Sequence, residues 1–572
     1  MNKTVSKMDA VLLEIIWNRM ITNLEEQAKT LIRTSFSSIV TDSEDLSAGL
    51  FDSKGNMIAQ ANTGTPGHIN SMALGVKHFL NKYPKDSLRP GDVLIGNNAY
   101  EISGHQLDIT VVTPAFFGKK LIGYVASTCH VVDIGGRGFN PEGESIYEEG
   151  LHIPYLKYYN DGKVNETLQS IIEANVREPE QVLGDIRAQI VAQEVSIKHL
   201  IGMMQEFKLT NIDEVGEEII QRSEKAMRKA IKRIPDGEYS NEIFSDGIDE
   251  PVKLKCIVKI QNDELTVDFT GSSPGSHKGI NVPLNYTIAY VTYALKLAIS
   301  PDIPNNEGSF RPVKIKAPEG SIVNAVHPMP TAARHIIGHF TPACVLGALY
   351  HVLPDNVIAD GANANWDIQV YGEKRNGDPF SYLFFMNGGM GARPNKDGLS
   401  VTGFPTGVRG TPVEIVESNS PIVFYQRELR QDSGGSGKFR GGLGQIVRFG
   451  VHTNKNYKFP TMFDRFNFPA TGLNDGKIGS KGAAIVNDKK NLHSKKMYNL
   501  EAKDIVTLKL PGGGGFGAPE KRDPKLVLED VRNGYVSIEK ARDDYLVIIK
   551  ETSSGYNLDT EQTRNIRKIK KL

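Results

Sequence analysis

The spacing of hydrophobic positions along the first 235 residues changes repeatedly between the period of a helix and that of a strand. Apolar residues recur three and four positions apart in three segments, which predicts helices over 6–35, 67–83 and most of 163–232. Two other segments are rich in β-branched and aromatic residues, and each is divided by a short turn that contains a glycine. They predict β-hairpins over 47–61 and 109–128.

The remainder of the chain is richer in strands and in glycine. The segment 238–275 is strand-like, 281–299 and 337–352 are apolar and helical, and strands separated by glycine turns follow up to about Pro511. We therefore predict a multi-domain α+β fold with mixed sheets and helices. The predicted units are an N-terminal α/β region that holds the candidate site, a β-rich mixed region and a C-terminal helical segment, over 1–235, 236–510 and 511–572.

Composition excludes several classes of protein. The 572 residues include 67 Lys and Arg and 67 Asp and Glu, so the formal net charge is zero and no overall field attracts nucleic acid or an anionic membrane. No apolar run approaches the ~18 residues of a membrane span, and the first residues lack the apolar core of a signal peptide. Three widely separated cysteines argue for a reducing compartment, so we expect a cytoplasmic protein.

The candidate chemistry is concentrated at the ends of the second predicted hairpin. His105 and Asp108 precede it and His130 and Asp133 follow it, each pair in the pattern His-x-x-Asp. If the turn centres on Gly118, residues whose numbers sum to about 236 face each other, so folding brings both pairs to one end of the hairpin. Two imidazoles and two carboxylates there would form a mixed N/O ligand set for a divalent metal such as Zn, Mn, Co or Fe.

Strand geometry sets a condition on this site. On a regular strand, residues i and i+3 point to opposite faces of the sheet. Each His-x-x-Asp must therefore leave the strand for both members to reach one ion, and the neighbouring Gly104, Gly135 and Gly136 allow such a turn. Cys129 adjoins His130, but on an apolar strand we expect a buried structural thiol in place of a ligand or a nucleophile.

Three other patterns are candidates for chemistry. The string Gly512–Gly517 fits a G-x-G-x-x-G spacing only because it is so rich in glycine, and no Lys-Ser/Thr follows it, so we expect a tight turn there. The string Asp432–Lys438 favours close backbone packing, and any ATP would bind a partner chain. His335 and His339 lie four residues apart on one helical face, a spacing that suits a metal, a structural role or a partner contact.

A series of longer strings extends in order over nearly the whole chain. They are EDLS with FDSKGNMIAQA, GHINSM, GDVLIGNNAY with GHQLD, HVVDIGG, EEGLHIPYLKYYNDGK, NVREPEQVLGDIRAQ, DFTGSS, NEGSFRPVKIKAPEGSIVNA, ESNSPIVFYQRELRQDSGGSGKFRGGLG and PGGGGFGAPEKRDP. Together they resemble the hydantoinase B / oxoprolinase family, which includes the B subunits of ATP-dependent hydantoinases. The larger subunits of acetone and acetophenone carboxylases are related to this family.

The resemblance implies a metal-dependent subunit of a heteromeric enzyme. Family members work with an ATP-binding A-type subunit, which phosphorylates a carbonyl or enol oxygen of the substrate. The B subunit holds a divalent metal and completes lactam ring opening or carboxylation. The family's ligands fall on His105, Asp108 and His130, with Asp133 or Asp45 to complete the set. Whichever of Asp45 and Asp133 is not a ligand is the candidate catalytic base.

Three further residues become candidates for the substrate site or for the surroundings of the metal: His68, Asn98 and Tyr100. In the common form of the family, Asn-Asp-Pro-Tyr precedes the first His-x-x-Asp. Here Asn98 and Ala99 take the places of the acid and the proline, and this departure leaves the substrate open.

The function expected from the sequence is the B subunit of an ATP-dependent amidohydrolase that opens a lactam or hydantoin ring after carbonyl phosphorylation. One alternative is a subunit of an ATP-dependent ketone carboxylase that uses bicarbonate; such large subunits tend to be longer than this chain, which favours the hydrolase. The other is a non-catalytic scaffold whose metal is structural, which a closed shell of four protein ligands would favour. We expect no nucleic-acid or membrane partner.

Overall fold

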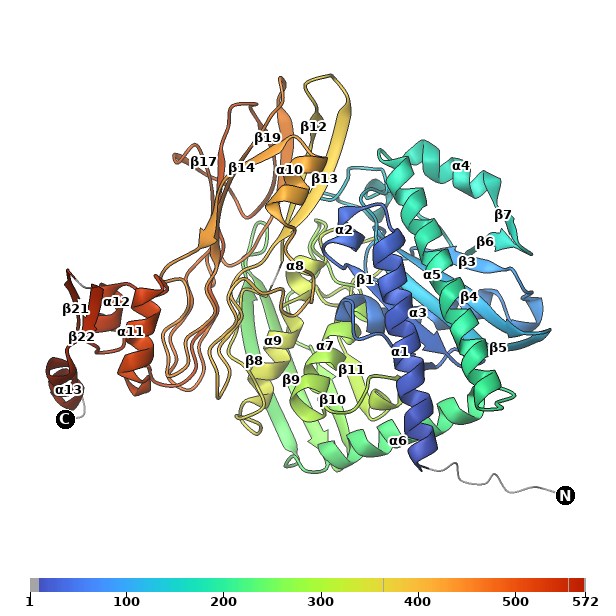
Figure 1. Cartoon of the computed structure of the whole chain (residues 1–572), viewed down its shortest axis with the longest axis horizontal. Coiled ribbons are helices and arrows are strands. Elements are labelled where there is room, and N and C mark those ends of the chain that lie inside the picture. The colour runs from blue at the N-terminus through green and yellow to red at the C-terminus, as the bar shows by residue number, and fades with distance from the viewer. Residues whose placement is uncertain (1–9, 364, 554, 570–572) are drawn as a thin grey trace.

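The computed structural model describes residues 10–363, 365–553 and 555–569. Along the chain, a sheet covered by helices is followed by a second sheet with its own helices, then by two packed sheets and a small C-terminal module (Figure 1). This is a multi-domain α+β architecture, as predicted. Among the described residues, no helix combines the length and the apolar character needed to cross a membrane.

The first sheet is antiparallel and has the strand order β2-β1-β5-β4-β3-β6-β7. Its strands are β1 (Leu46–Phe51), β2 (Met57–Gln60), β3 (Val93–Gly96), β4 (Asp108–Phe117), β5 (Lys120–His130), β6 (Leu156–Asn160) and β7 (Lys163–Val164). Both predicted hairpins are confirmed, since β1 pairs with β2 and β4 pairs with β5. The β4–β5 hairpin lies at the centre of the sheet, so its ends are surrounded by other elements.

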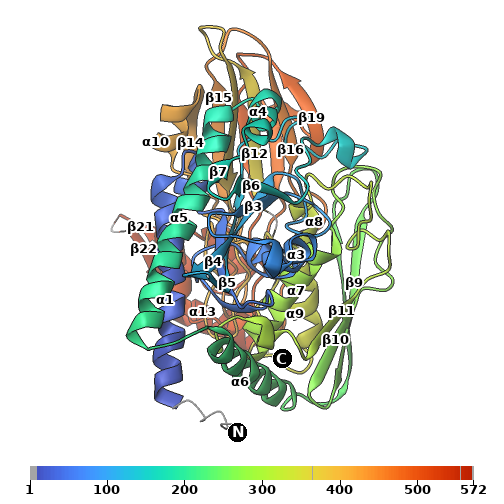
Figure 2. The same ribbon diagram turned by 90° about the vertical axis from the view of Figure 1, so that its right-hand side faces the viewer.

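Helices cover both faces of this sheet (Figure 2). Alternate residues of β5 face opposite ways, as a pleated strand requires. Val125 and Cys129 join the core beneath α1 (Ala10–Thr34) and α5 (Pro179–Glu206), while Tyr124 and Ala126 join the core beneath α3 (Pro66–Lys82). The helices predicted at 6–35 and 67–83 are therefore confirmed, and Cys129 is a buried free thiol as expected. Short helices α2 (Ser38–Thr41) and α4 (Glu166–Asn175) complete this region.

The second region packs helices on a four-stranded sheet in the order β11-β10-β9-β8. Its strands are β8 (Gly237–Ser245), β9 (Val252–Gln261), β10 (Glu264–Asp268) and β11 (Val313–Lys316), and its helices are α6 (Asp213–Ile231), α7 (Leu284–Ile299), α8 (His335–Gly338) and α9 (Thr341–Leu349). Helix α7 packs against both α3 and α9 and so joins the two regions. One core contains residues from both sides of position 235, and a domain boundary there remains a prediction.

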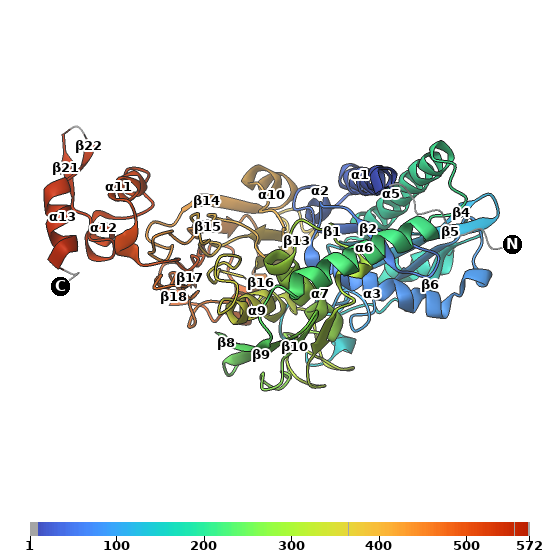
Figure 3. The same ribbon diagram turned by 90° about the horizontal axis from the view of Figure 1, so that it is seen from below.

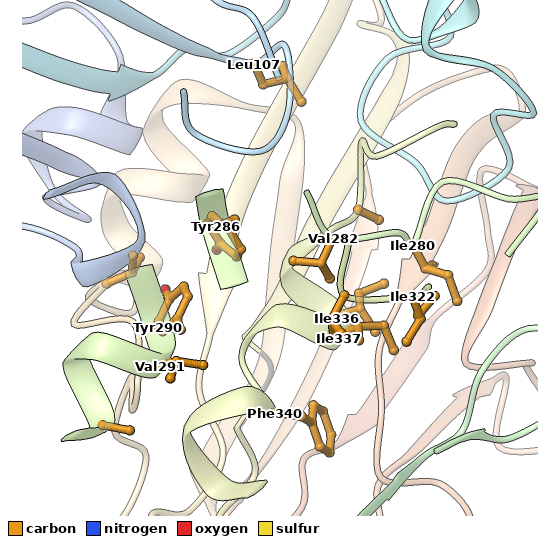
Figure 4. Packing of buried hydrophobic residues seen from close by; sticks show 14 of the residues in the cluster. Leu107, Ile280, Val282, Tyr286, Tyr290, Val291, Ile322, Ile336, Ile337 and Phe340 are labelled. Atoms are coloured by element: carbon orange, nitrogen blue, oxygen red, sulfur yellow. The ribbon is translucent and has the colours of Figure 1, made fainter. Parts of the chain in front are cut away.

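Figure 4 shows this shared core around α7 and α8. Tyr286 and Tyr290 lie one turn apart on α7, and Ile336 and Ile337 lie on the adjacent α8. All four side chains are buried in the same core. This packing fixes the residues on either side of α8, including those that reach the candidate site.

Two packed sheets form the third region. One has the order β13-β12-β16-β19 and the other β14-β15-β20-β17-β18. The strands are β12 (Trp366–Glu373), β13 (Pro379–Met386), β14 (Ile422–Leu429), β15 (Gln445–Val451), β16 (Tyr457–Met462), β17 (Ala483–Val486), β18 (Lys490–Asn491), β19 (Lys495–Leu500) and β20 (Val506–Lys509), with α10 (Val413–Asn419) beside β14. Their inner faces share one apolar core, which includes Trp366, Phe384, Phe449 and Leu508.

The glycine strings form a layer of backbone packed on backbone. The amide of Gly513 donates to the carbonyl of Gly442, that of Gly514 to Asp360 and that of Gly435 to Gly513. A Cβ added at Gly513 would lie 2.1 Å from the carbonyl oxygen of Met390. The packing expected for Asp432–Lys438 is therefore confirmed. It extends to Gly512–Gly517, where the sequence predicts a tight turn, because only glycine lets backbones approach this closely.

The C-terminal module lies at the end of the molecule far from the first sheet (Figure 3). It consists of α11 (Pro524–Arg532), α12 (Ile538–Asp543), β21 (Ile549–Thr552), β22 (Gly555–Leu558) and α13 (Thr560–Ile569), with a small core of its own. The sequence predicted helices alone here, and the β21–β22 hairpin corrects that prediction. Helix α12 ends before the β-branched run that leads into β21, because such residues favour strands. Single 3-10 turns lie at Lys85–Ser87, Ile146–Glu148, Glu307–Ser309 and Pro519–Lys521.

Candidate metal centre

The candidate site lies at the open end of the β4–β5 hairpin. Asp108 begins β4 and pairs in register with His130, the last residue of β5. His105 lies in the irregular segment before β4, where Gly104 has a φ of 88°. The chain therefore leaves the strand between His105 and Asp108, and the pleat does not separate the two side chains. This is the geometry that the first His-x-x-Asp required.

Three ligand atoms converge at this point. Asp108 Oδ1 lies 2.9 Å from His105 Nε2 and 3.1 Å from His130 Nδ1. Among the described residues, His105, Asp108 and His130 form the group whose ligand atoms all lie within 4.8 Å of one another, and all three are buried. The chain thus brings two imidazoles and one carboxylate to one point from a loop and from the ends of two strands.

The donor atoms fit a divalent cation. His105 Nδ1 lies 2.9 Å from the carbonyl oxygen of Ala332, which places the proton on Nδ1 and leaves the lone pair of Nε2 facing Asp108. Within the described part of the chain, His105 Nε2 is buried without a hydrogen-bond partner of suitable geometry, while His130 turns its Nδ1 toward Asp108. Burial and the charge of Arg334 lower the pKa of His105 to about 3, so its imidazole is neutral, as a ligand must be.

The second oxygen of Asp108 is held by charged side chains. His68 Nε2 lies 2.9 Å from Asp108 Oδ2, and the guanidinium of Arg334 donates to the same oxygen. Burial alone would raise the pKa of Asp108, but the charges of His68 and Arg334 oppose it, and the pKa is held well below its usual value. Asp108 is therefore an anion in a buried site.

His68 links Asp108 to a second carboxylate. Its Nδ1 lies 3.5 Å from Asp45 Oδ1, so the imidazole bridges the two aspartates. Burial opposes charge on His68, yet the pKa is raised because Asp108 and Asp45 flank the ring. Asp45 is thus linked to Asp108 by the imidazole of His68. It does not itself belong to the group formed by His105, Asp108 and His130.

The structure places the other predicted residues apart from the converging atoms. Asp133 is buried, and its carboxylate accepts from the backbone and the side chain of Arg177. The side chain of Asn98 donates to Glu101 at 3.0 Å and accepts from the amide of Tyr100 at 3.0 Å. Asn98 and Tyr100 line a separate cavity, described below.

A small internal cavity adjoins the converging atoms. It measures about 30 Å³, which is room for a metal ion or for one or two waters. Its walls are Asp45, Thr65, His68, His105, His130, Phe139, Tyr286, Tyr290, Arg334, His335, His339, Asn365, Asp367, Phe385, Thr406 and Val408. The site is thus assembled from the first sheet, from the ends of α7 and α8 and from the two-sheet region.

Several of these residues carry no signal in the local sequence. Arg334 lies 226 positions from Asp108, and no local pattern marks it. The spacing of His335 and His339 is visible in the sequence, but the two residues have different partners: His335 Nε2 lies 3.2 Å from Asp367 Oδ2, and His339 Nε2 lies 3.1 Å from the hydroxyl of Tyr286. Burial lowers the pKa of His335 and raises that of Asp367, which favours the neutral form of both groups.

The fold and the site define a family. The chain belongs to the Hydantoinase B/oxoprolinase family, whose model matches residues 9–519. It is 32% identical to the B subunit of a putative D-/L-hydantoinase of Pseudomonas sp. (strain NS671), over 99% of this chain and 99% of that protein. It is 29% identical to the beta subunit of the caprolactamase of Pseudomonas jessenii, over 95% and 97% of the two chains.

Solved structures agree with this assignment. The crystal structure of ATP-dependent caprolactamase from Pseudomonas jessenii matches with a TM-score of 0.89 at 26% identity, covering 98% of this chain and all of that one. A nucleotide-free structure of acetone carboxylase matches with a TM-score of 0.88 at 20% identity, covering 99% and 83% of the two chains. The second likeness is one of fold.

Proposed function

We propose that this chain is the metal-binding subunit of an ATP-dependent enzyme that opens a cyclic amide. The observation that carries the proposal is the convergence of His105 Nε2, Asp108 Oδ1 and His130 Nδ1 in a buried site. The names of two relatives, the B subunit of a hydantoinase and the beta subunit of a caprolactamase, support the substrate class and a partner subunit. An ATP-dependent enzyme with three free buried cysteines suits the cytoplasm.

The chain's own residues supply a ligand set with one negative charge. Asp108 is an anion, His105 is neutral, and Ala332 fixes the tautomer that turns Nε2 toward the site. A divalent cation bound by these atoms would polarise a carbonyl oxygen and lower the pKa of water. The two imidazoles and one carboxylate leave further positions for substrate, as an open catalytic site requires and a closed structural shell does not.

Proton transfer falls to the pair formed by Asp45 and His68. His68 contacts both Asp108 and Asp45, and these two carboxylates raise its pKa. Asp45 holds the other side of the ring and lines the same cavity. A proton removed from water in this cavity would pass to the carboxylate of Asp45, which His68 holds in place. Asp133 remains a candidate base only if its pairing with Arg177 opens.

ATP is assigned to a partner chain. The glycine string that most resembles a nucleotide loop has its amides engaged, because Gly513, Gly514 and Gly515 donate to Gly442, Asp360 and Lys477. A phosphate cradle needs such amides free. We therefore assign carbonyl phosphorylation to an ATP-binding A-type subunit, and ring opening to the site built on His105, Asp108 and His130.

The test is turnover by the complex of this chain with its ATP-binding subunit. Hydantoin, 5-oxoproline and ε-caprolactam are supplied with and without ATP, and with and without bicarbonate. We expect ATP-dependent ring opening that is independent of bicarbonate and is lost in Asp108→Asn. Asp92→Asn is the matched control, because Asp92 is equally buried but pairs with Lys157 away from the site. A product that requires bicarbonate would favour a carboxylase. Full activity of Asp108→Asn would favour the alternative in which this chain is a non-catalytic scaffold.

A further inference from the structure

The cavity beside the candidate metal ligands is too small for an organic substrate. Its volume of about 30 Å³ accommodates water or an ion, while a cyclic amide is several times larger. The histidines that line it are all buried. The body of any substrate must therefore be held by another part of the chain that reaches the same residues.

A second cavity is large enough to hold such a ring. It measures about 470 Å³, within the usual range for small-molecule sites of roughly 300–1,000 Å³. Its rim is aromatic: the ring of His327 lies 5.7 Å from that of Tyr100 and 5.5 Å from that of Tyr147, both edge to face. Tyr147 is 75% exposed, which is unusual for a large aromatic side chain and leaves its ring free for a ligand. We call this space the Tyr147 cavity.

Gln106 follows the candidate ligand His105 directly in the chain. Consecutive residues line the two cavities, His105 the metal cavity and Gln106 the Tyr147 cavity. The backbone carbonyl of Gln106 accepts from the side chain of Asn97 at 2.7 Å, so the residue is fixed in place. Its side chain is only 4% exposed, and among the described residues its Oε1 has no hydrogen-bond partner. A buried amide oxygen without a partner is uncommon and marks a place for a donor.

We propose that the Tyr147 cavity binds the ring of the cyclic amide and that Gln106 recognises its amide edge. A cyclic amide is held cis, so its N–H and C=O lie on the same edge of the ring. The side-chain amide of glutamine presents a matching acceptor and donor and can bond to both at once. The ring would lie against Tyr100 and Tyr147, with its amide turned toward the segment that holds His105. This inference rests on the proposed function and specifies where its substrate binds.

The charges of the cavity favour a neutral ligand over an anion. Glu101 is the acidic residue of its lining, and its carboxylate is engaged by Tyr155 and Asn98. His152 also lines it, and burial together with the neighbouring His327 lowers the pKa of His152. A phosphate would therefore meet a carboxylate and the neutral imidazole of His152, whereas a lactam whose carbonyl is not yet phosphorylated is uncharged and meets aromatic rings and one amide.

Direct binding to the purified full chain tests the proposal without requiring turnover. The probes are 2-pyrrolidinone, hydantoin and ε-caprolactam, together with N-methyl-2-pyrrolidinone, which lacks the N–H donor; binding is followed by saturation-transfer NMR and calorimetry. Tyr147→Ala should weaken binding about tenfold through loss of ring contact. Gln106→Leu should weaken the N–H probes about tenfold and erase the preference over the N-methyl probe. Tyr425→Ala, at another exposed tyrosine, should change nothing.

The outcomes separate this inference from the proposed function. Metal content is measured in every variant, and unchanged content in Gln106→Leu shows that His105 and Asp108 are intact. Weaker binding in Tyr147→Ala and Gln106→Leu supports the cavity even if the complex turns over none of the probes, in which case the proposed reaction alone fails. If no probe binds, or if both variants bind as the wild type does, the cavity assignment is wrong. ATP-dependent turnover with an unchanged KM in both variants would also overturn it, and the proposed function would stand.

Discussion

Asp108 and His130 face each other directly across the β4–β5 hairpin, and the carboxylate Oδ1 of one lies 3.1 Å from Nδ1 of the other. The turn at Gly118 and a β-bulge between Ala115 and Phe116 set this register, because shifting an antiparallel pair by one residue would move one side chain to the opposite face. His105 then joins the pair from the preceding loop. A local feature of the chain, the length of one hairpin, thus assembles the candidate metal centre.

Asp133 of the second His-x-x-Asp is either a metal ligand or a structural partner of Arg177, and a substitution distinguishes the two roles. Its carboxylate is bonded to the backbone and side chain of Arg177. Asp133→Asn should therefore leave the metal content unchanged but lower the free energy of unfolding by about 1–3 kcal/mol, through loss of a buried charged acceptor. Metal analysis and urea unfolding of the same preparation measure both quantities. A variant that loses metal at unchanged stability would make Asp133 a ligand.

Arg334 should stabilise the protein most when no cation is present. It is a buried guanidinium paired with Asp108, and removing one member of such a pair costs about 3–5 kcal/mol. Arg334→Met should lose stability of that order in chelator-treated protein, and added Mn²⁺ or Zn²⁺ should restore part of it because a cation replaces the missing positive charge. Arg311→Met, in a half-exposed ion pair, should change stability by less than about 1 kcal/mol. Equal unfolding free energies for Arg334→Met and wild type would contradict this.

Glu149 should make stability depend on pH. Its Oε1 accepts from the amides of Thr331 and Ala332, the segment whose carbonyl orients His105, and burial raises the pKa of Glu149 from 4.5 to about 8. Between these two values the folded chain retains a proton that the unfolded chain has released. Stability should therefore fall as the pH rises through this window, by up to about 1.4 kcal/mol per pH unit, and level off above it.

Glu149→Gln keeps the accepting oxygen and removes the titration. Urea unfolding at pH 5, 6.5 and 8 should show the variant losing less stability than wild type as the pH rises. The difference between the two proteins is the relevant quantity, because other groups titrate in both. Parallel pH profiles would mean that Glu149 is ionised throughout the window.

The features that the sequence predicted correctly are those that depend on local patterns along the chain. The helix α1, the hairpins and the approach of Asp108 to His130 follow from hydrophobic period and turn length, both of which act over short separations. Arg334 could not be predicted, because it reaches Asp108 across 226 positions through the packing of α7 and α8. Asp133 could not be assigned from its motif either, because its partner Arg177 comes from outside the hairpin.

The glycine layer was predictable only in part. The strings signal close backbone approach, but not which segments approach each other. Gly513→Ala should lower the free energy of unfolding by about 3 kcal/mol or more, because its Cβ would lie 2.1 Å from the Met390 carbonyl oxygen. Gly202→Ala is the control: this glycine lies within α5 with nothing in reach of a Cβ, so alanine should stabilise the helix by up to about 1 kcal/mol. Similar effects of the two substitutions on denaturant unfolding would refute this account of the layer.

The central claim is that His105, Asp108 and His130 hold a divalent cation. The most direct measurement is the metal content of the purified full chain, compared with that of a His105→Ala/His130→Ala double variant and of a His277→Ala/His351→Ala control that removes two histidines elsewhere. We predict close to one equivalent of metal in the wild type and the control, and almost none in the double variant. Equal metal content in all three proteins would contradict the account.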